Sequence, residues 1–294
     1  MIKEINAKHI LGINKNPSSW FGIKYIMNIY RGCEHRCIYC DSRSKCYGID
    51  NFDDVLVKVN AAELLKKELS GKRKKATIGT GAMSDPYTFS EKKYKLTEKT
   101  LKIIADYGYP LHMTTKSNMV MRDIDILEEI SKIYAVVAFT LTTTDDVLAR
   151  KVEPFAPIPS DRLKAMGVLS VLGIDTGVTM MPILPFIEDN EKNIINIVKQ
   201  TKEYGGKFIY PTFGVTLRDV QRDYYYKELD KKFPGLSQKY QKRFGENYYC
   251  GANNYKKISE TFKEACYKYG ISTKMPSYEN KLNSIQLSLF DKKE

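Results

Sequence analysis

The sequence lacks any long apolar stretch. No window of it approaches the roughly 20 uncharged apolar residues that a membrane-spanning helix requires. The first residues, MIKEINAKHI, lack the apolar run of a secretory signal. We therefore expect a soluble, cytoplasmic protein. With 43% of its 294 residues hydrophobic, the chain can bury a large core in one α/β domain with an appendage.

Acidic residues are fewer than basic ones, 35 against 47, so the formal net charge is +12. A basic surface suits a polyanionic partner such as nucleic acid. Solvated, lysine-rich surfaces are also common. Charge alone therefore leaves nucleic-acid binding and a plain soluble surface open.

Cysteine is scarce as well, with six residues. A reducing compartment keeps thiols free, so metal or redox work is a better interpretation than disulfides. Cys33, Cys37 and Cys40 crowd into eight residues. One loop can wrap three such thiolates around an iron–sulfur cluster, and because four cysteines normally close a [4Fe–4S] cluster, one iron would stay open.

Two other interpretations of these cysteines compete. One is a zinc site completed by His35 or Cys46, and the other is a chance grouping of buried thiols. Zinc sites usually show a second cysteine pair, whereas Cys250 and Cys266 stand alone. The spacing therefore favours an iron–sulfur cluster.

Strand-like and helix-like stretches alternate along the chain. Short apolar or β-branched runs predict strands at residues 24–30, 76–79, 111–115, 135–140, 177–181 and 208–210. Longer amphipathic stretches predict helices at residues 61–70, 96–107, 124–133, 161–172 and 191–204. This alternation predicts an α/β fold, a partial (β/α)6 TIM-like barrel, with a mainly helical C-terminal extension.

Composition divides the chain into four parts. We expect a leader over residues 1–24, the barrel over 25–217, a basic, Tyr-rich extension over 218–280, and a flexible tail over 281–294. The tyrosines of the extension could stack on exposed bases or form a small helical core. We expect core for most of them and surface for a few.

Polar clusters follow four of the predicted strands. They are residues 33–40, 84–87, 116–117 and 140–144. Chemistry collects at the carboxyl ends of the strands in barrels of this kind. One shared site is therefore expected at that end.

The three cysteines, with the aromatic Tyr39 before the last, resemble the signature of the radical S-adenosylmethionine (SAM) superfamily. The resemblance implies a [4Fe–4S] cluster whose open iron binds the amino and carboxylate groups of SAM. One electron then cleaves the sulfonium and yields a 5′-deoxyadenosyl radical. The protein contributes by positioning the cofactor and shielding the reactive radical.

The wider pattern of RGCEHRCIYC, GTGAMSDPYT, TTKS, FTLT and MMPILPFIED resembles the spore photoproduct lyase branch over residues 25–190. The resemblance implies that Ser84 and Lys116 contact SAM, with Lys116 pairing its carboxylate. Thr140 stands where the branch has a cofactor-contacting serine, and Tyr39 is expected near the adenine. Lysine suits a carboxylate as a point charge, although Lys116 could be one more solvated lysine.

Glu153 and Arg162 also resemble positions near the pocket of this branch. An ion pair at the start of a helix explains them almost as well.

The sequence departs from the lyase in its hydrogen-return route. Ala82 and Met83 stand where the lyase has a cysteine, and Asp41 stands where it has a tyrosine. The resemblance to the lyase therefore does not imply that this chain reverses thymine dimers. Cys250 could be a substitute hydrogen donor, or a cysteine packed beside aromatic residues.

The end of the sequence carries a pentapeptide that matches the binding motif for the bacterial sliding clamp. Its residues are Gln286, Leu287, Ser288, Leu289 and Phe290. Such peptides place apolar anchors in a preformed groove. The alternative is that this short apolar segment folds back onto the barrel.

These observations favour a radical SAM enzyme that acts on damaged or modified DNA and takes electrons from a donor such as flavodoxin or ferredoxin. Modification of RNA or protein is the alternative enzyme function. A non-catalytic iron–sulfur module that binds nucleic acid is a third possibility.

Overall fold

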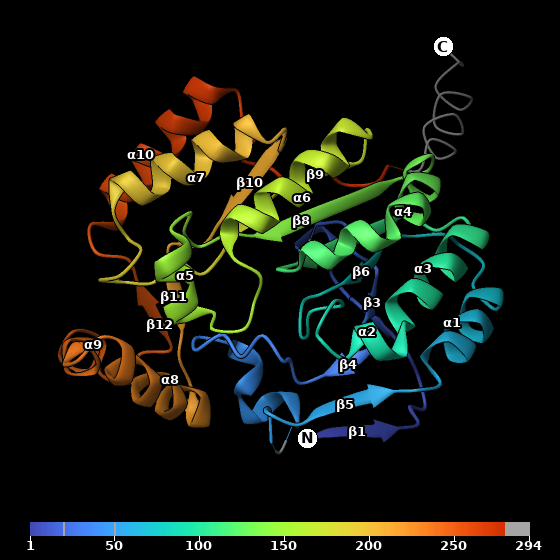
Figure 1. The fold of residues 1–294 in the computed structure, drawn as a ribbon, viewed down its shortest axis with the longest axis horizontal. Helices are drawn as coiled ribbons and strands as arrows, with labels where there is room; N and C mark the ends of the chain where they lie inside the picture. The colour runs from blue at the N-terminus through green and yellow to red at the C-terminus, as the bar shows by residue number, and fades with distance from the viewer. Residues whose placement is uncertain (20, 50, 280–294) are drawn as a thin grey trace, which may run out of the picture.

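A seven-stranded sheet organises the molecule (Figure 1). The computed structural model describes residues 1–19, 21–49 and 51–279. The strand order is β10-β9-β8-β7-β6-β3-β2; the strands from β10 to β3 are parallel, and β2 is antiparallel to β3. In chain order the strands are β2 (Leu11–Ile13), β3 (Tyr25–Met27), β6 (Ile78–Thr80), β7 (Leu111–Thr115), β8 (Ala135–Thr140), β9 (Asp175–Met180) and β10 (Phe208–Pro211). The predicted partial barrel is confirmed.

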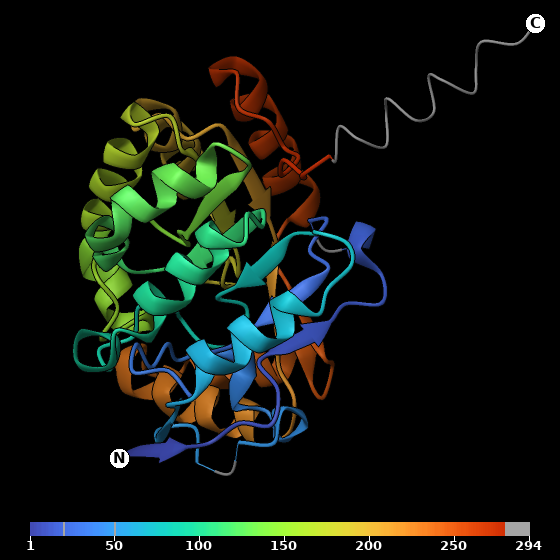
Figure 2. The same cartoon turned by 90° about the vertical axis from the view of Figure 1, so that its right-hand side faces the viewer.

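Helices connect the parallel strands and cover the outer face of the sheet (Figure 2). They are α1 (Ala61–Ser70), α2 (Glu91–Tyr94), α3 (Leu96–Asp106), α4 (Ile124–Ser131), α5 (Asp146–Val152), α6 (Pro159–Val171) and α7 (Glu191–Glu203). Short 3-10 turns, η1 (Pro17–Ser19), η2 (Asp41–Arg43), η3 (Lys45–Tyr47) and η4 (Asn118–Asp123), lie in the connections. All five predicted helices are present, with ends shifted by two residues or fewer. None of these helices, nor any other in the described part of the chain, is both long and apolar enough to cross a membrane.

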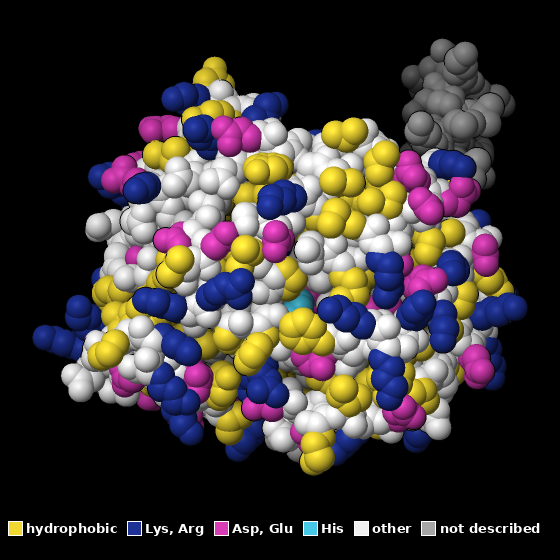
Figure 3. Space-filling view, viewed as in Figure 1, with side chains coloured by type: hydrophobic (Ala, Val, Ile, Leu, Met, Phe, Trp, Pro, Cys, Tyr) yellow, Lys and Arg dark blue, Asp and Glu magenta, His cyan; other side chains and the backbone are white. Residues whose placement is uncertain are grey.

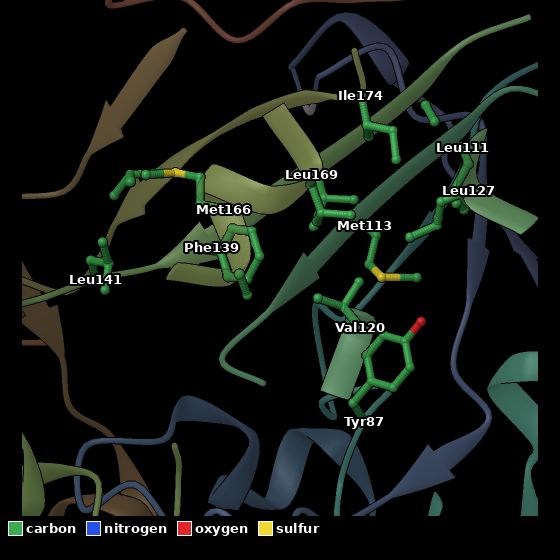
Figure 4. Packing of buried hydrophobic residues seen from close by; sticks show 14 of the residues in the cluster. Tyr87, Leu111, Met113, Val120, Leu127, Phe139, Leu141, Met166, Leu169 and Ile174 are labelled. Atoms are coloured by element: carbon green, nitrogen blue, oxygen red, sulfur yellow. The ribbon is translucent and has the colours of Figure 1, made fainter. Parts of the chain in front are cut away.

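Side chains alternate between the two faces of the barrel strands. Outward residues such as Met113 and Phe139 pack against the helices, where Leu127 and Leu169 meet them (Figure 4). Inward residues of β8 and β10 form a separate small cluster of Val136, Ala138 and Phe208. Gly177 of β9 faces that cluster, because a Cβ there would lie 2.6 Å from the Phe208 ring. The outer face is therefore the main core, and the lumen is partly filled.

The N-terminal region adds a second sheet that the sequence did not predict. Its strands, in the order β1-β5-β4, are β1 (Ile2–Ile5), β5 (Val55–Lys58) and β4 (Tyr30–Arg31). The strand predicted at residues 24–30 is therefore wrong as one element. Its first half, β3, lies in the barrel, whereas its second half, β4, pairs with β5. The cysteines follow β4 directly.

The C-terminal region is mainly helical, as predicted. It contains α8 (Asp219–Lys232), α9 (Leu236–Phe244) and α10 (Tyr255–Tyr269), with the antiparallel pair β11 (Gly214–Thr216) and β12 (Tyr249–Gly251). Figure 2 shows α8 and α9 (orange) at one end of the molecule and α10 (red) at the other. Helix α10 packs on α7. Helices α8 and α9 share an apolar cluster with Cys37, Ile38 and Tyr39, so this region covers the cysteine loop.

Candidate functional site

A cavity of about 300 Å³ opens at the carboxyl ends of the parallel strands. Cys33, Cys37 and Cys40 line it together with Ser84, Lys116 and Thr140. The four polar clusters that the sequence placed after separate strands therefore meet at one site. Its volume is at the lower end of the range for small-molecule sites.

Backbone and side-chain hydrogen bonds hold the cysteine loop in place. The N–H of Ile38 donates to the carbonyl of Val152 at 2.9 Å, which ties the loop to α5. The Glu34 carboxylate accepts from the Thr88 hydroxyl at 2.8 Å and from the Ser90 N–H at 2.6 Å. The loop is thus fastened to the segments that follow β8 and β6.

Burial disfavours the charged form of all three thiols. It raises the pKa of Cys33 to about 12, with the nearby Asp85 adding to the effect. Burial also raises the pKa of Cys40, and that of Cys37 well above its usual value. Thiolates in such a place need a compensating cation, and a bound metal centre provides one.

Asp85 joins the ends of β6 and β7. Its carboxylate accepts from the Thr115 hydroxyl at 2.8 Å and from the backbone N–H groups of Lys116 and Tyr87 at 2.7 and 2.9 Å. Gly81 permits this approach, because a Cβ there would lie 1.8 Å from the Thr114 carbonyl oxygen and its φ is +94°. The SDPY cluster was recognisable in the sequence, but the role of Asp85 in connecting β6 and β7 was not predicted.

Two buried polar atoms beside Asp85 have no hydrogen-bond partner among the described residues. They are Ser84 Oγ and His35 Nδ1, the latter 3.5 Å from the Asp85 carboxylate, and both residues line the cavity. Ser84 is 6% exposed and His35 is 1% exposed. Burial lowers the pKa of His35, so its ring is neutral. Buried polar atoms are normally satisfied, so Ser84 Oγ has unused hydrogen-bonding capacity at the cavity.

A buried charge network supports Lys116. The Glu153 carboxylate pairs with Arg162 at 2.5 Å and with Lys116 Nζ at 3.9 Å, and it accepts a short hydrogen bond from the Tyr39 hydroxyl. Burial by itself raises the pKa of Glu153, but the Arg162 and Lys116 charges outweigh it and the pKa is lowered. Lys116 Nζ also lies 5.7 Å from the centre of the Tyr39 ring. Lys116 is therefore a positively charged side chain that this network fixes in the wall of the cavity.

Thr140 is fixed at the end of β8. Its hydroxyl lies 3.1 Å from the hydroxyl of Thr179, and its carbonyl accepts from Arg162 at 2.8 Å. Glu153 and Arg162 thus form a buried ion pair beneath the cavity wall.

The rim of the cavity carries a second ionic group. The Asp41 carboxylate accepts from the Tyr47 hydroxyl and from Arg218, each at 2.6 Å. The Arg218 guanidinium lies 5.5 Å from the Tyr47 ring centre and 5.3 Å from that of Tyr248, which is 51% exposed. Tyr47 and Arg218 were not predicted, because no local signal links them to the cysteines.

Aromatic and sulfur groups meet at another part of the cavity lining. The rings of Phe21 and His112 stack with centroids 5.6 Å apart, and both residues line the cavity. Met275 contacts His112 Nε2. These side chains occupy the part of the lumen near the start of β7.

The remaining cysteines lie elsewhere. Cys250 is 1% exposed and packs in the apolar cluster of Val215, Tyr225 and Tyr240. It does not line the cavity, whereas Ala82 and Met83 do. Cys46 is exposed and accepts from the Ser44 hydroxyl at 3.3 Å.

The clamp-motif residues 286–290 lie outside the described residues.

The tyrosines of the extension are divided between core and surface. Tyr225 and Tyr240 are buried, and their hydroxyls lie 2.9 Å apart. Tyr248 and Tyr249 are exposed. The extension thus has both buried and exposed tyrosines, and base stacking by the exposed ones stays a prediction.

The model of the Radical SAM superfamily matches residues 27–210. The chain belongs to the radical SAM superfamily. This result confirms the resemblance in the cysteine motif, and the chain is a radical SAM enzyme, a family whose members use an iron–sulfur cluster and SAM.

Relatives of this radical SAM protein include two uncharacterized proteins. Rv2578c of Mycobacterium tuberculosis is 28% identical over 291 residues, which cover 95% of this chain and 85% of its own. MJ0683 of Methanocaldococcus jannaschii is 35% identical over 193 residues, which cover 64% of this chain and 70% of its own.

Among solved structures, spore photoproduct lyase complexed with dinucleoside spore photoproduct has the same fold. Its TM-score is 0.68 at 16% identity, covering 91% of this chain and 79% of that chain. A variant of that lyase with bound AdoMet and the same photoproduct has a TM-score of 0.67 at 16% identity, covering 91% and 78%. The predicted likeness to the lyase branch is thereby confirmed in the fold.

The residues around the cavity fit the cofactors of this family. Among the described residues, no group of three or more His, Cys, Asp or Glu side chains is arranged so that it could hold a single metal ion. The three cysteines line the same cavity as Lys116 and Ser84, whose Oγ has no hydrogen-bond partner among the described residues. Sulfur ligands, a cation and a free hydroxyl in one cavity suit an iron–sulfur cluster next to a charged amino acid.

Proposed function

We propose that Cys33, Cys37 and Cys40 hold a [4Fe–4S] cluster and that the cavity binds SAM against it. When bound there, the cluster supplies the electron that splits the sulfonium of SAM into methionine and a 5′-deoxyadenosyl radical. The observation that carries this proposal is the convergence of the three cysteines with Ser84, Lys116 and Thr140 on one cavity.

The side chains of the chain orient the cofactor in this proposal. Lys116 pairs the methionine carboxylate as a point charge, and Glu153 holds the Lys116 ammonium in the cavity wall. Ser84 Oγ has free hydrogen-bonding capacity for the polar part of SAM. Thr140 and the backbone near Tyr39 complete the wall. Phe21 and His112 fill part of the lumen and so leave less room for water beside the cofactor.

We further propose that the substrate is DNA with a damaged or modified base. The net charge of +12 suits a polyanion. Arg218 lies beside both the rim residue Tyr47 and the exposed Tyr248, and such cation–aromatic groups bind phosphates and stack on bases. The fold is that of an enzyme whose structure holds a dinucleoside photoproduct.

The hydrogen-return step of the lyase has no counterpart among the cysteines at the cavity. Ala82 and Met83 line the cavity in place of the lyase cysteine. Cys250 is buried in an apolar cluster and its position fits packing. A lesion other than the spore photoproduct therefore suits this cavity better.

The C-terminal pentapeptide, residues 286–290, supports recruitment to DNA by the sliding clamp. Leu289 and Phe290 would be the apolar anchors, and Gln286 would set the register through its amide.

The test is anaerobic incubation of the reconstituted protein with SAM, dithionite, and ultraviolet-damaged or alkylated oligonucleotides. Mass analysis should find 5′-deoxyadenosine together with a mass change in one oligonucleotide class. Undamaged oligonucleotide and matched RNA are the controls. Formation of 5′-deoxyadenosine with all DNA unchanged and RNA altered would move the substrate to RNA.

A further inference from the structure

The part of the cavity near the start of β7 has a lining of its own. Phe21, Ile23 and Ile26 line it together with Gly79 and His112. The strand register places Ile26 beside Gly79, and Gly79 beside His112. Ile23 packs closely on Gly79, because a Cβ at Gly79 would lie 2.6 Å from Ile23 Cγ2. We call these five residues the lumen slot.

The lumen slot contains no Lys, Arg, Asp or Glu side chain. The residues of these types that line the cavity are Arg36, Asp41, Asp85 and Lys116, which lie in or directly after the cysteine loop or directly after β6 and β7. Figure 3 shows Lys and Arg side chains (dark blue) spread over the outer surface of the face that it displays. A charged group in the slot would lose its hydration without gaining an ionic partner. A ligand of the slot is therefore neutral.

His112 is the polar side chain of the lumen slot. It is the second residue of β7 and is 1% exposed. Its ring stacks on that of Phe21, with centroids 5.6 Å apart and 12° between the ring planes. Burial lowers the pKa of His112 to about 4, so the ring is neutral at physiological pH. A neutral imidazole has one N–H donor and one acceptor nitrogen.

The contact with Met275 decides which nitrogen of His112 carries the proton. Nε2 lies against Met275 Sδ. A thioether sulfur accepts hydrogen bonds and does not donate them, so the proton is on Nε2. Nδ1 is then the acceptor nitrogen, and it has no hydrogen-bond partner among the described residues. Because buried polar atoms are normally satisfied, Nδ1 has unused capacity for one N–H donor.

Thr114 supplies a second polar group on the same face of β7. It lines the cavity, as His112 does. Alternate residues of a strand share a face and lie about 7 Å apart. The Thr114 hydroxyl can donate or accept a hydrogen bond. Two polar groups in line, opposite apolar side chains, suit a neutral planar ring with an N–H group on its edge.

We propose that the lumen slot receives the base of the DNA substrate and that His112 Nδ1 accepts a hydrogen bond from an N–H group on the edge of that base. This inference deepens the proposed function and rests on it. Nucleobases are neutral, planar and carry such N–H groups. Enzymes that modify a base commonly extrude it from the strand into an enclosed pocket. The phosphates then stay outside, near the rim.

The adenine of SAM carries the same kind of N–H group. In the proposed binding mode, however, the SAM carboxylate lies at Lys116 and the adenine lies near Tyr39. Lys116 and His112 are four residues apart along the chain, which is about 13 Å in extended backbone. The slot is therefore left to the substrate, and the two sources of the N–H group can be tested separately.

The experiment measures binding of single-stranded oligonucleotides to the reconstituted protein with SAM and without reductant, by fluorescence anisotropy. Each oligonucleotide carries one base between abasic positions. The probes form two pairs: thymine with N3-methylthymine, and adenine with N6,N6-dimethyladenine. Methylation removes the N–H donor and keeps the ring neutral. The wild type should bind the unmethylated member of at least one pair about 5- to 10-fold more tightly, as expected for one hydrogen bond.

Three variants assign that preference. His112→Phe keeps an aromatic ring against Phe21 but lacks the acceptor nitrogen, so the preference should disappear. His112→Asn can place an amide oxygen close to the position of Nδ1 and should restore most of it. His9→Phe changes a histidine whose side chain is 84% exposed, and it should behave like the wild type.

Equal affinity of the wild type for both members of both pairs would overturn the proposal. A preference that persists in His112→Phe would also overturn it, because the bulk of the methyl groups would then be the cause. If His112→Phe lost SAM affinity in isothermal titration calorimetry and kept the preference, the slot would belong to the adenine of SAM. Failure of the wild type to form 5′-deoxyadenosine with dithionite would instead reject the proposed function, which the binding preference does not measure.

Discussion

At the residue scale, the chemistry of the site depends on how Lys116 is held. Burial lowers its pKa, whereas the thiolate form of Cys37 and the Glu153 carboxylate raise it, and the net pKa lies above the ordinary value. Its side chain is 19% exposed. The Lys116 ammonium is thus charged and largely shielded from water, as expected of a group that binds a carboxylate.

Replacing Lys116 by methionine removes that charge and keeps the length of the side chain. We expect the dissociation constant for SAM to rise about 10- to 100-fold, because a charge-assisted contact is lost. Isothermal titration calorimetry under argon measures it. Lys102→Met, at an exposed pair with Glu98, is the control. Unchanged affinity in Lys116→Met would reject the carboxylate role.

Glu188 is a second informative residue. Its carboxyl accepts from the Thr142 hydroxyl at 2.7 Å and from the Leu184 N–H at 2.9 Å, and burial raises its pKa to about 8. The folded state therefore holds a proton that the unfolded state releases above its usual pKa of 4.5. The resulting stability is complete below pH 4.5 and is lost as the pH rises to about 8.

Glu188→Gln keeps both hydrogen bonds, with the amide donating to Thr142, and removes the titration. The difference in free energy of unfolding between variant and wild type should grow toward high pH, by at most about 1.4 kcal/mol per unit. Thermal unfolding at several values from pH 5 to 9 checks it. Parallel curves for the two proteins would show that Glu188 does not titrate in this range.

At the element scale, the barrel strands were predictable because strands buried on both faces read as short apolar, β-branched runs. The pattern could not divide residues 24–30, since β3 and β4 are each three residues or fewer and join different sheets. The clusters at the strand ends were also visible. The pairings among them, such as Asp85 with Thr115, join separate elements and leave no periodic signal.

The buried Arg162–Glu153 pair links α6, the end of α5 and the carboxyl end of β8. Arg162→Met leaves the Glu153 carboxylate without its closest cation, so we expect a loss of about 3 kcal/mol in free energy of unfolding. Lys207→Met breaks the exposed pair with Asp175 and should cost less than about 1 kcal/mol. Urea unfolding of the two variants distinguishes them, and equal losses would contradict a structural role for the buried pair.

At the scale of the whole molecule, the C-terminal extension packs against two separate parts of the protein. Helix α10 completes the packing of α7, whereas α8 and α9 cover the cysteine loop. The sequence indicated a helical, Tyr-rich region but not this division, because which helix meets which surface is decided by contacts distant in sequence.

The clamp motif gives a prediction for the complete chain. Leu289→Ala with Phe290→Ala should weaken binding to a purified bacterial sliding clamp about 100-fold or more, because anchor residues carry most of the energy of such peptides. Surface plasmon resonance measures it. Lys292→Ala with Lys293→Ala, in the same tail, should bind normally. Equal binding by both variants would remove the link to the clamp.

The most direct measurement is 5′-deoxyadenosine formed from SAM and dithionite by anaerobically reconstituted protein, in the wild type, in Cys37→Ala and in Cys46→Ala. We expect the wild type and Cys46→Ala to carry a brown chromophore and form the product, and Cys37→Ala to form none. Product at the wild-type level in Cys37→Ala, or none from the brown wild type, would contradict a SAM-cleaving cluster on these three cysteines.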